Sequence, residues 1–164
     1  MIHIIEGDLF STNADVICHQ VNYQGKMGSG VAKQIKEKYP EAYKEYKEVC
    51  NHFDTQSKKE KLLGWPQLVK IHNTCDKYIA NMFCQLNYGH DGKRYTNYEA
   101  VYNALEHLDG MFASHVTFAF PYCFGCDRGG ANWNIILKMI EVVFKDREIF
   151  IYKLKIPLDV HPPL

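Results

Sequence analysis

The 164-residue chain has no excess of charge of either sign, because 19 lysines and arginines balance 19 aspartates and glutamates. A chain balanced in this way has no global electrostatic attraction to nucleic acid or to an anionic membrane. We therefore expect no sequence-specific binding of nucleic acid. A small anionic ligand in a local pocket stays compatible with the composition.

Long apolar runs are also missing. No stretch approaches the roughly 20 apolar residues of a membrane-spanning helix. The opening residues, MIHIIEGDLF, lack the basic region and the cleavable apolar segment of a secretion signal. We expect a cytoplasmic protein with no membrane partner. Its six cysteines are then expected to be reduced thiols rather than a disulfide framework.

The remaining composition is that of an ordinary globular protein, with 46% hydrophobic and 23% charged residues. These proportions exclude disordered and fibrous classes, and 164 residues suffice for one domain with its own core. Internal repeats, low-complexity tracts and linkers are absent. We therefore expect a single domain over residues 1–164.

Apolar runs typical of strands alternate along the chain with apolar residues at helical spacing. Strands are predicted over 2–6, 16–21, 68–72, 78–83, 116–120 and 149–152, and helices over 31–39, 42–50, 98–108 and 133–144. Residues 51–61 and 85–96 are predicted loops, 73–77 a turn, and 154–164 an extended surface segment. This alternation predicts an α/β domain with one mixed sheet between two helical layers.

Two strands run into glycine-rich loops that each open a helix. The loops read NYQGKMGSG at 22–30 and PYCFGCDRGGAN at 121–132, with Asn132 at the expected N-cap. Glycine lets successive backbone N–H groups point at one centre, and a helix N-terminus adds partial positive charge. Two such loops suggest a diphosphate ligand, although a tight turn packed on a neighbouring strand is the alternative for each.

Neither loop carries a standard nucleotide signature. The first lacks the Lys-Ser/Thr pair of a Walker A loop, and its Gly28-Ser29-Gly30 is not followed by a glycine three residues later, as a dinucleotide fingerprint requires. The C-x-x-C of Cys123 and Cys126 lies in a loop, about seven residues before the helix, which suits a redox motif poorly. A zinc site could recruit His72 and Cys75, but no paired C-x-x-C modules support one.

Two polar residues at strand ends each admit two interpretations. Asp8 either caps a turn after the first strand or accepts a hydrogen bond from an exocyclic amine such as N6 of adenine. His19 is either a structural residue or a proton-transfer group beside the first loop. Strand alternation predicts His19 and Val21 on one face of the sheet and Gln20 and Asn22 on the other.

Six segments together resemble the macrodomain family. They are GDL (7–9), CHQVN (18–22), GKMGSGVA (25–32), KYPEAYKEY (38–46), FPYCFGC (120–126) and IFIY (149–152). Within that family they look most like the branch of ADP-ribose-1″-phosphate phosphatases and terminal ADP-ribose protein glycohydrolases. The resemblance implies a three-layer α/β/α sandwich with a central mixed sheet. It also implies a partner that is ADP-ribose or a derivative, either small or attached to a macromolecule.

The resemblance also implies roles for individual residues. Asp8 and Leu9 would hold the adenine amine, Tyr152 would lie against adenine, the first loop would surround the distal ribose and diphosphate, and residues 122–127 would close over the diphosphate. The implied ligand-binding set is Asp8, Leu9, Gln20, Val21, Gly25, Met27, Gly28, Ser29, Gly30, Val31, Tyr122, Cys123, Phe124, Gly125, Cys126 and Tyr152.

The chain departs from the family pattern at several positions. Asp127-Arg128 stands where relatives have small and apolar residues. The glycohydrolase relatives carry a lysine where this chain has Cys84-Gln85 and an aspartate where it has Gly129, so a lysine-adduct mechanism is not expected.

The expected activity is therefore hydrolysis of an ADP-ribose derivative by a phosphatase-like or deacylase-like site. His19 matches a histidine of the phosphatase relatives and is predicted to act as general acid/base, while Asn22 positions a ribose hydroxyl. Asp127 either orients water or the histidine, or faces solvent. We expect no metal and no cofactor. The alternative is a module that binds ADP-ribose or an ADP-ribosylated partner without turnover.

Overall fold

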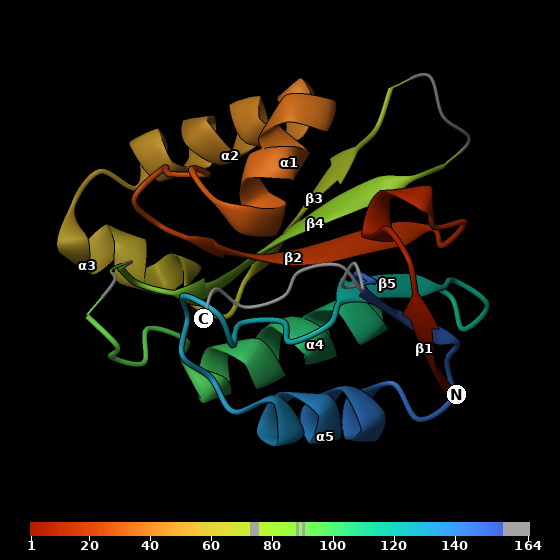
Figure 1. Cartoon of the computed structure of the whole chain (residues 1–164). Coiled ribbons are helices and arrows are strands. Elements are labelled where there is room, and N and C mark those ends of the chain that lie inside the picture. The colour runs from red at the N-terminus through yellow and green to blue at the C-terminus, as the bar shows by residue number, and fades with distance from the viewer. Residues whose placement is uncertain (73–75, 88, 90, 156–164) are drawn as a thin grey trace, which may run out of the picture.

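The sheet has six strands in the order β1-β6-β5-β2-β4-β3 in the computed structural model, which describes residues 1–72, 76–87, 89 and 91–155. Its strands are β1 (Ile2–Glu6), β2 (Val16–Asn22), β3 (Pro66–Lys70), β4 (Tyr78–Gln85), β5 (Phe118–Pro121) and β6 (Ile149–Lys153). Helices α1 (Gly30–Lys38) and α2 (Pro40–His52) cover one face, and α4 (Tyr98–Met111) and α5 (Trp133–Val143) cover the other (Figure 1). The predicted three-layer sandwich is confirmed.

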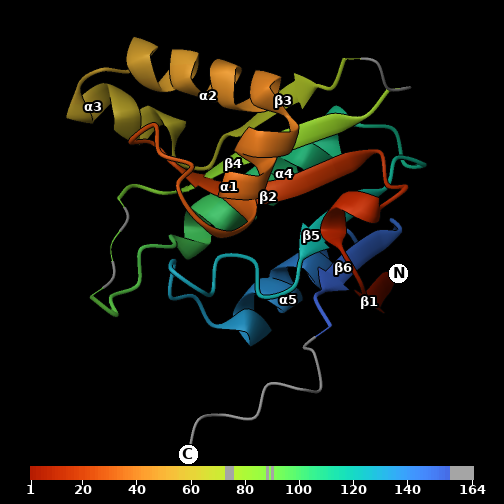
Figure 2. The same ribbon diagram turned by 45° about the horizontal axis from the view of Figure 1, so that its top comes forward.

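Strand direction gathers the connecting loops at one edge. Every neighbouring pair in the sheet is parallel except β3 with β4, so the sheet is mixed as predicted. Parallel strands place their carboxyl ends together, and in such sheets ligands bind at that edge. Figure 2 shows the loops that follow β2, β4 and β5 at the same edge of the sheet.

Side chains along β2 are buried on both faces of the sheet, because each face has its own core. Val16 and Cys18 join the cluster under α4 and α5, where the rings of Phe118 and Phe144 stack with centroids 4.9 Å apart. Ile17 joins the cluster under α1. Two buried faces explain why β2 reads as a nearly continuous apolar run rather than an alternating one.

Several predicted boundaries were wrong. Residues 51–61 are not a plain loop: α2 runs to His52, and a short helix α3 (Gln56–Lys59) follows, with the Thr55 hydroxyl accepting from Lys58 N at 3.4 Å. Strand β5 begins at Phe118 rather than Val116, and the preceding Thr117 N donates to the Asp15 carboxylate at 2.7 Å.

The other boundary differences are small, and part of the prediction is not testable. β3 covers Pro66–Lys70 rather than 68–72, and β4 continues to Gln85. The Asn132 side chain accepts from Asn134 N at 2.9 Å, which confirms the predicted N-cap of α5. Residues 73–75 of the predicted turn, 88 and 90 of the long loop and 156–164 of the tail lie outside the described residues.

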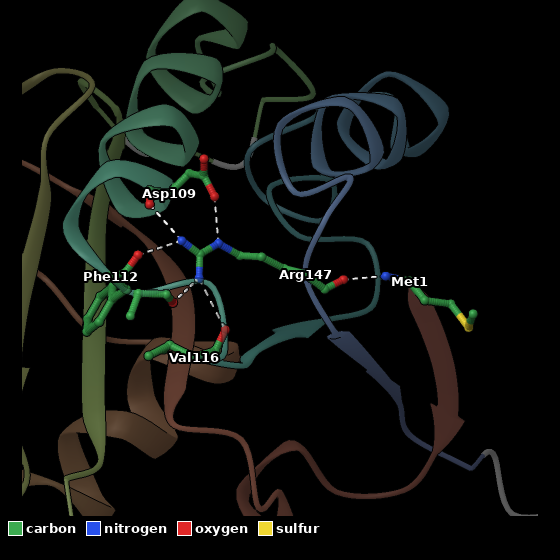
Figure 3. Close-up of polar contacts among 6 residues, drawn as sticks. Met1, Asp109, Phe112, Val116 and Arg147 are labelled. Atoms are coloured by element: carbon green, nitrogen blue, oxygen red, sulfur yellow. Dashed lines mark hydrogen bonds and ion pairs between the residues drawn. The ribbon is translucent and has the colours of Figure 1, made fainter.

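A buried arginine joins α4 to β6 at the amino-terminal edge of the sheet (Figure 3). Arg147 is 6% exposed, and its Nε donates to Asp109 Oδ1 at 2.5 Å. Its other nitrogens donate to the main-chain carbonyls of Asp109, Phe112, Ala113 and Val116. The guanidinium thereby satisfies carbonyl groups that the end of α4 leaves without helical partners.

Candidate functional site

A cavity of about 470 Å³ lies where the loops after β2, β4 and β5 meet. That volume is within the range of small-molecule sites, roughly 300–1,000 Å³. Thirteen of the predicted site residues line it: His19, Gln20, Val21, Asn22, Gly28, Ser29, Gly30, Val31, Tyr122, Cys123, Phe124, Gly125 and Asp127. The structure therefore brings both glycine loops and the end of β2 around one space.

The first loop is organised by the side chain of Asn22. Its Oδ1 accepts from Gln24 N at 2.9 Å, and its Nδ2 donates to Lys26 O at 3.0 Å. From α2, the hydroxyl of Tyr46 donates to Asn22 O at 2.7 Å and lies 3.0 Å from Oδ1. Asn22 therefore holds the loop in shape, which leaves little of its amide for the ribose hydroxyl that the sequence predicted.

The predicted face of Asn22 was wrong. The register of β2 against β4 shifts between Val21 and Asn22, so that Val21 pairs with Phe83 and Asn22 with Gln85. At this irregularity the carboxamide of Asn22 lies against Tyr46, on the same side as Val21. A bulge of this kind changes the direction of a side chain without changing the sequence pattern.

The N-terminus of α1 faces the cavity. Gly28, Ser29 and Gly30 line it, and the hydroxyl of the N-cap residue Ser29 makes no capping hydrogen bond. The first N–H groups of a helix have no helical acceptors, and the helix dipole adds partial positive charge there. This end of the cavity can bind an anionic oxygen through main-chain N–H groups.

The second loop is held by Thr96, a buried residue that the sequence did not single out. Its hydroxyl donates to Gly125 O at 2.7 Å, and Gly129 O accepts from Tyr95 N at 2.8 Å and from Thr96 N at 2.9 Å. A Cβ at Gly129 would stand 2.1 Å from the Thr96 hydroxyl, and Gly125 has φ of +72°. Both positions therefore require glycine.

Gln20 connects β2 to the same network on the α4 and α5 side of the sheet. Its Nε2 donates to the Thr96 hydroxyl at 2.8 Å and to Gln85 Oε1 at 2.5 Å. Its Oε1 is buried and has no hydrogen-bond partner among the described residues. An unpaired buried acceptor is costly, so this atom is available to a donor in the cavity.

His19 lies beneath the cavity on the α1 and α2 side, and its side chain is 1% exposed. Nε2 is 2.5 Å from Asn81 Oδ1, whereas Nδ1 has no partner among the described residues. Burial lowers the pKa of His19 to about 4, against a smaller opposing effect of the Asn81 hydrogen bond. The imidazole is therefore neutral near pH 7. In that state it can act as a proton acceptor, but it carries no extra proton to donate.

A protein-family model described as Macro domain matches residues 18–140, which is most of the chain. The chain belongs to the macrodomain family. The observed fold and the glycine-loop cavity agree with this membership, so the family and fold predicted from the sequence are both confirmed.

Two curated proteins and one solved structure illustrate the likeness. An ADP-ribose 1″-phosphate phosphatase from Candida glabrata is 27% identical over 161 residues, covering 95% of this macrodomain and 80% of that protein. A DNA ADP-ribosyl transferase–DNA ADP-ribosyl glycohydrolase fusion protein from Thermosipho africanus is 24% identical over 177 residues. The match spans 99% of this chain but only 42% of that fusion protein. Thermosipho africanus DarTG in complex with ADP-ribose superposes with a TM-score of 0.72 at 21% identity, covering 99% of this chain and 43% of that one.

Six predicted ligand residues of this macrodomain do not line the cavity: Asp8, Leu9, Gly25, Met27, Cys126 and Tyr152. Leu9 and Met27 are buried in the core, and Gly25 packs against Lys47 and Cys50 of α2. Asp8 accepts from Phe10 N at 3.0 Å, which is the turn-capping alternative.

Tyr152 and Asp8 nevertheless lie at the same edge of the sheet as the cavity. Tyr152 lies near the end of β6, and Asp8 follows the parallel strand β1. Tyr152 O accepts from the backbone N–H of the cavity residue Tyr122 at 2.8 Å. Asp8 remains exposed. Their predicted contact with adenine is a prediction that this geometry leaves untested.

The charged lining comes from both loops. Asp127 and Arg128 are exposed and line the cavity from the second loop, and Lys26 lines it from the first. Lys26, Ala32, Gln85, Gly89, Pro121 and Gly129 complete the lining and were not in the predicted set. Lys26 and Gly129 could have been found from their places inside the quoted loops, and Gln85 from its place where the glycohydrolase relatives carry a lysine.

The two loop cysteines differ in position. Cys123 lines the cavity and Cys126 does not. Burial raises the pKa of the Cys126 thiol to about 11, and the neighbouring Cys123 adds to the effect. A protonated thiol is a poor nucleophile and a poor metal ligand. Within the described ranges no three His, Cys, Asp or Glu residues cluster to hold a metal. Cys75 of the H-x-x-C pair lies outside those ranges.

Proposed function

We propose that this macrodomain binds ADP-ribose derivatives in the cavity and hydrolyses them at the distal ribose, with ADP-ribose-1″-phosphate as the first substrate to test. The observation that carries the proposal is the arrangement of His19 beneath a cavity whose walls are two glycine-rich loops. The Candida glabrata relative is named an ADP-ribose 1″-phosphate phosphatase, and the Thermosipho DarTG structure contains ADP-ribose.

The loops supply binding in this proposal. The N-terminus of α1 and the main chain around Gly125 provide N–H groups to the diphosphate. Lys26 and Arg128 add positive charge from the two sides. An anion bound by fixed main-chain groups needs little reorganisation, which suits a site that must hold a doubly charged linker in one position.

His19 supplies the proton acceptor. A water molecule attacks phosphorus, the bond from phosphorus to the ribose oxygen breaks, and the water proton passes through Nδ1 of His19 to the leaving oxygen. Because burial lowers the pKa of His19, the ring is unprotonated at neutral pH and has a free lone pair. The same shift makes it a weaker base, so in this proposal it holds the water proton only until the leaving oxygen takes it. Asp127, on the second loop, is exposed at the cavity and orients the water.

A lysine adduct is not part of this mechanism. At the end of β4 the chain has buried Cys84, followed by Gln85, whose side chain is hydrogen-bonded to Gln20 and to Asn87 O. Gly129 is buried under Thr96. Neither position presents an amine or a carboxylate to the cavity.

The test is turnover of ADP-ribose-1″-phosphate, followed by release of inorganic phosphate. We expect His19→Ala to lower kcat by about 100- to 1,000-fold, the usual contribution of a proton-transfer group. His107→Ala, which changes an exposed histidine on α4, is the matched control and should retain wild-type activity. Undiminished turnover by His19→Ala would remove His19 from the mechanism.

A second candidate function is a binding module without turnover. The absence of a lysine at Cys84-Gln85 favours it over a glycohydrolase. Calorimetry that finds micromolar ADP-ribose binding would select it, provided that the 1″-phosphate, O-acyl ester and ADP-ribosyl-macromolecule linkages all stay intact in parallel assays.

The location of the protein in the cell is also part of the proposal. None of the helices formed by the described residues combines the length and apolar character that a bilayer crossing requires. A cytoplasmic location is proposed, and fractionation of cells that express the chain would test it. No cofactor is proposed for the reaction, since water and His19 suffice for the hydrolysis.

A further inference from the structure

Asn81 is a fully buried polar residue in the middle of β4, and it lies beside His19 of the neighbouring strand β2. The two residues are paired in the register of β2 and β4. Burying an amide without complete hydrogen bonding is costly, so the partners of Asn81 define how its two ends must point.

The amide of Asn81 can have only one orientation. One end lies 3.2 Å from the main-chain oxygen of Ala42 in α2 and 3.2 Å from Gln67 Oε1 in β3. A main-chain carbonyl only accepts hydrogen bonds, so the atom that faces it is the donor Nδ2. The opposite end, which faces His19 at 2.5 Å, is therefore the acceptor Oδ1.

This orientation fixes the tautomer of the imidazole. Because Asn81 Oδ1 accepts, Nε2 of His19 carries the hydrogen, and in a neutral ring Nδ1 is then the unprotonated nitrogen. Burial lowers the pKa of His19 and keeps the ring neutral, while the hydrogen bond to Asn81 raises that pKa by a smaller amount. Nδ1 is the ring nitrogen that lacks a partner among the described residues.

We infer that Asn81 is a positioning residue: it holds His19, which lines the cavity, as the Nε2–H tautomer, so that its buried Nδ1 is a hydrogen-bond acceptor. This rests on the proposed function of the cavity and deepens it. A group that binds at Nδ1 must donate, so the site takes a sugar hydroxyl or the attacking water there. A phosphate oxygen, which only accepts when ionised, is excluded from that contact.

The tautomer can be measured without any activity assay. Two-bond ¹⁵N–¹H correlation spectra of histidine-labelled protein at pH 7 report which ring nitrogen of His19 carries the hydrogen, with His19→Ala used to assign the signals. We expect Nε2–H and an unprotonated Nδ1. Observation of the Nδ1–H tautomer, or of a doubly protonated ring, would overturn the inference.

The consequence for turnover is tested with Asn81→Leu, which keeps the approximate volume and removes the acceptor. We expect a loss of the single Nε2–H tautomer and a fall in kcat of about 100-fold, because a histidine in the wrong tautomer cannot accept the proton. The dissociation constant of ADP-ribose should stay within about twofold, since Asn81 does not line the cavity.

Gln67→Met is the matched control. It removes one of the two acceptors of Asn81 Nδ2 but leaves the Ala42 contact that orients the amide. The tautomer and kcat should both remain those of the wild type. A reduction in kcat as large as that of Asn81→Leu would mean that packing around β3 and β4, rather than the tautomer, sets activity, and the inference would be wrong.

The inference and the proposed function fail in different ways. An Nε2–H tautomer in a protein that hydrolyses none of the tested ADP-ribose derivatives supports the positioning role while contradicting the proposed hydrolysis. A protein that turns over substrate with His19 in the Nδ1–H form does the reverse. If Asn81→Leu does not fold, the wild-type spectrum alone still decides the tautomer.

Discussion

Arg147 and His19 are both buried side chains that can carry charge, and they stand at opposite edges of the same sheet. At the amino-terminal edge, each guanidinium nitrogen of Arg147 donates to a carboxylate or carbonyl oxygen. At the carboxyl-terminal edge, His19 keeps one nitrogen without a partner among the described residues, and Gln20 Oε1 is in the same condition. The first arrangement stabilises the fold, whereas the second leaves acceptors for a ligand.

The two regions also differ in what surrounds them. Arg147 binds the end of α4, and its partners are the Asp109 carboxylate and main-chain carbonyls of the helix and of the segment after it. His19 and Gln20 lie under loops that end in glycine-rich turns, and their partners are other side chains from β4 and the loop after it. Complete pairing within the fold indicates a structural residue, and incomplete pairing beside a cavity indicates a functional one.

The largest effect is expected at Arg147. Arg147→Met should lower the free energy of unfolding by about 3 kcal/mol, because the carbonyls at the end of α4 lose their donors. For a chain of this size that corresponds to a fall in Tm of roughly 6–12 °C. ADP-ribose affinity, measured well below the new Tm, should stay within about twofold. A Tm within a degree or two of the wild type would contradict the structural role.

His19 should instead appear as a pH dependence of stability. Its pKa is about 4 in the folded protein, against 6.5 for the unperturbed side chain in the unfolded chain. Between those pH values the unfolded chain therefore binds more protons. The stabilisation is complete above pH 6.5 and is lost as the pH falls toward 4, by about 3 kcal/mol in total.

Urea denaturation of wild type and His19→Leu at several values between pH 7 and pH 4 measures this loss. The variant should lose less stability over that interval, because leucine does not titrate. Parallel curves for the two proteins would mean that burial of His19 does not affect its protonation as described.

The smallest effect is expected from the exposed charge on the first loop. Lys26→Ala should weaken ADP-ribose binding by roughly 1.5- to 5-fold, since exposed ion pairs contribute about 0.2–1 kcal/mol. Raising the ionic strength to 1 M should remove most of the difference between variant and wild type. Calorimetry at both salt concentrations provides the measurement, and an effect that is independent of salt would show that Lys26 acts through loop shape.

Local patterns in the sequence predicted the layers, the strand–loop–helix units and the N-cap at Asn132, because hydrophobic period and capping chemistry are local properties. The predicted site residues that belong to those units, such as Ser29 and Gly125, line the cavity, and their roles in ligand binding stay predictions. The predicted set was incomplete where the partner is distant: Asn81 reads as one more residue of an apolar strand, and Thr96 as one more polar loop residue.

The residues that were misplaced or not singled out have the same kind of cause. Asn22 was assigned to the wrong face because it bonds to the first loop and to Tyr46 of α2, where the pairing of β2 with β4 is irregular. Arg147 sits in a charged stretch of sequence, and only the folded chain brings α4 to it. Met27 stands inside a glycine loop, yet its apolar side chain is buried in the core. Such outcomes follow from tertiary packing, which no local pattern reports.

The carbonyl of Gly129 accepts from the amides of Tyr95 and Thr96 and so joins the second glycine loop to the segment that leads into α4. Separating the loop from that segment at Gly129 breaks both hydrogen bonds. The rate of hydrogen exchange at those two amides therefore reports how often this part of the cavity wall opens. A ligand that closes the wall should slow both amides together and by the same factor.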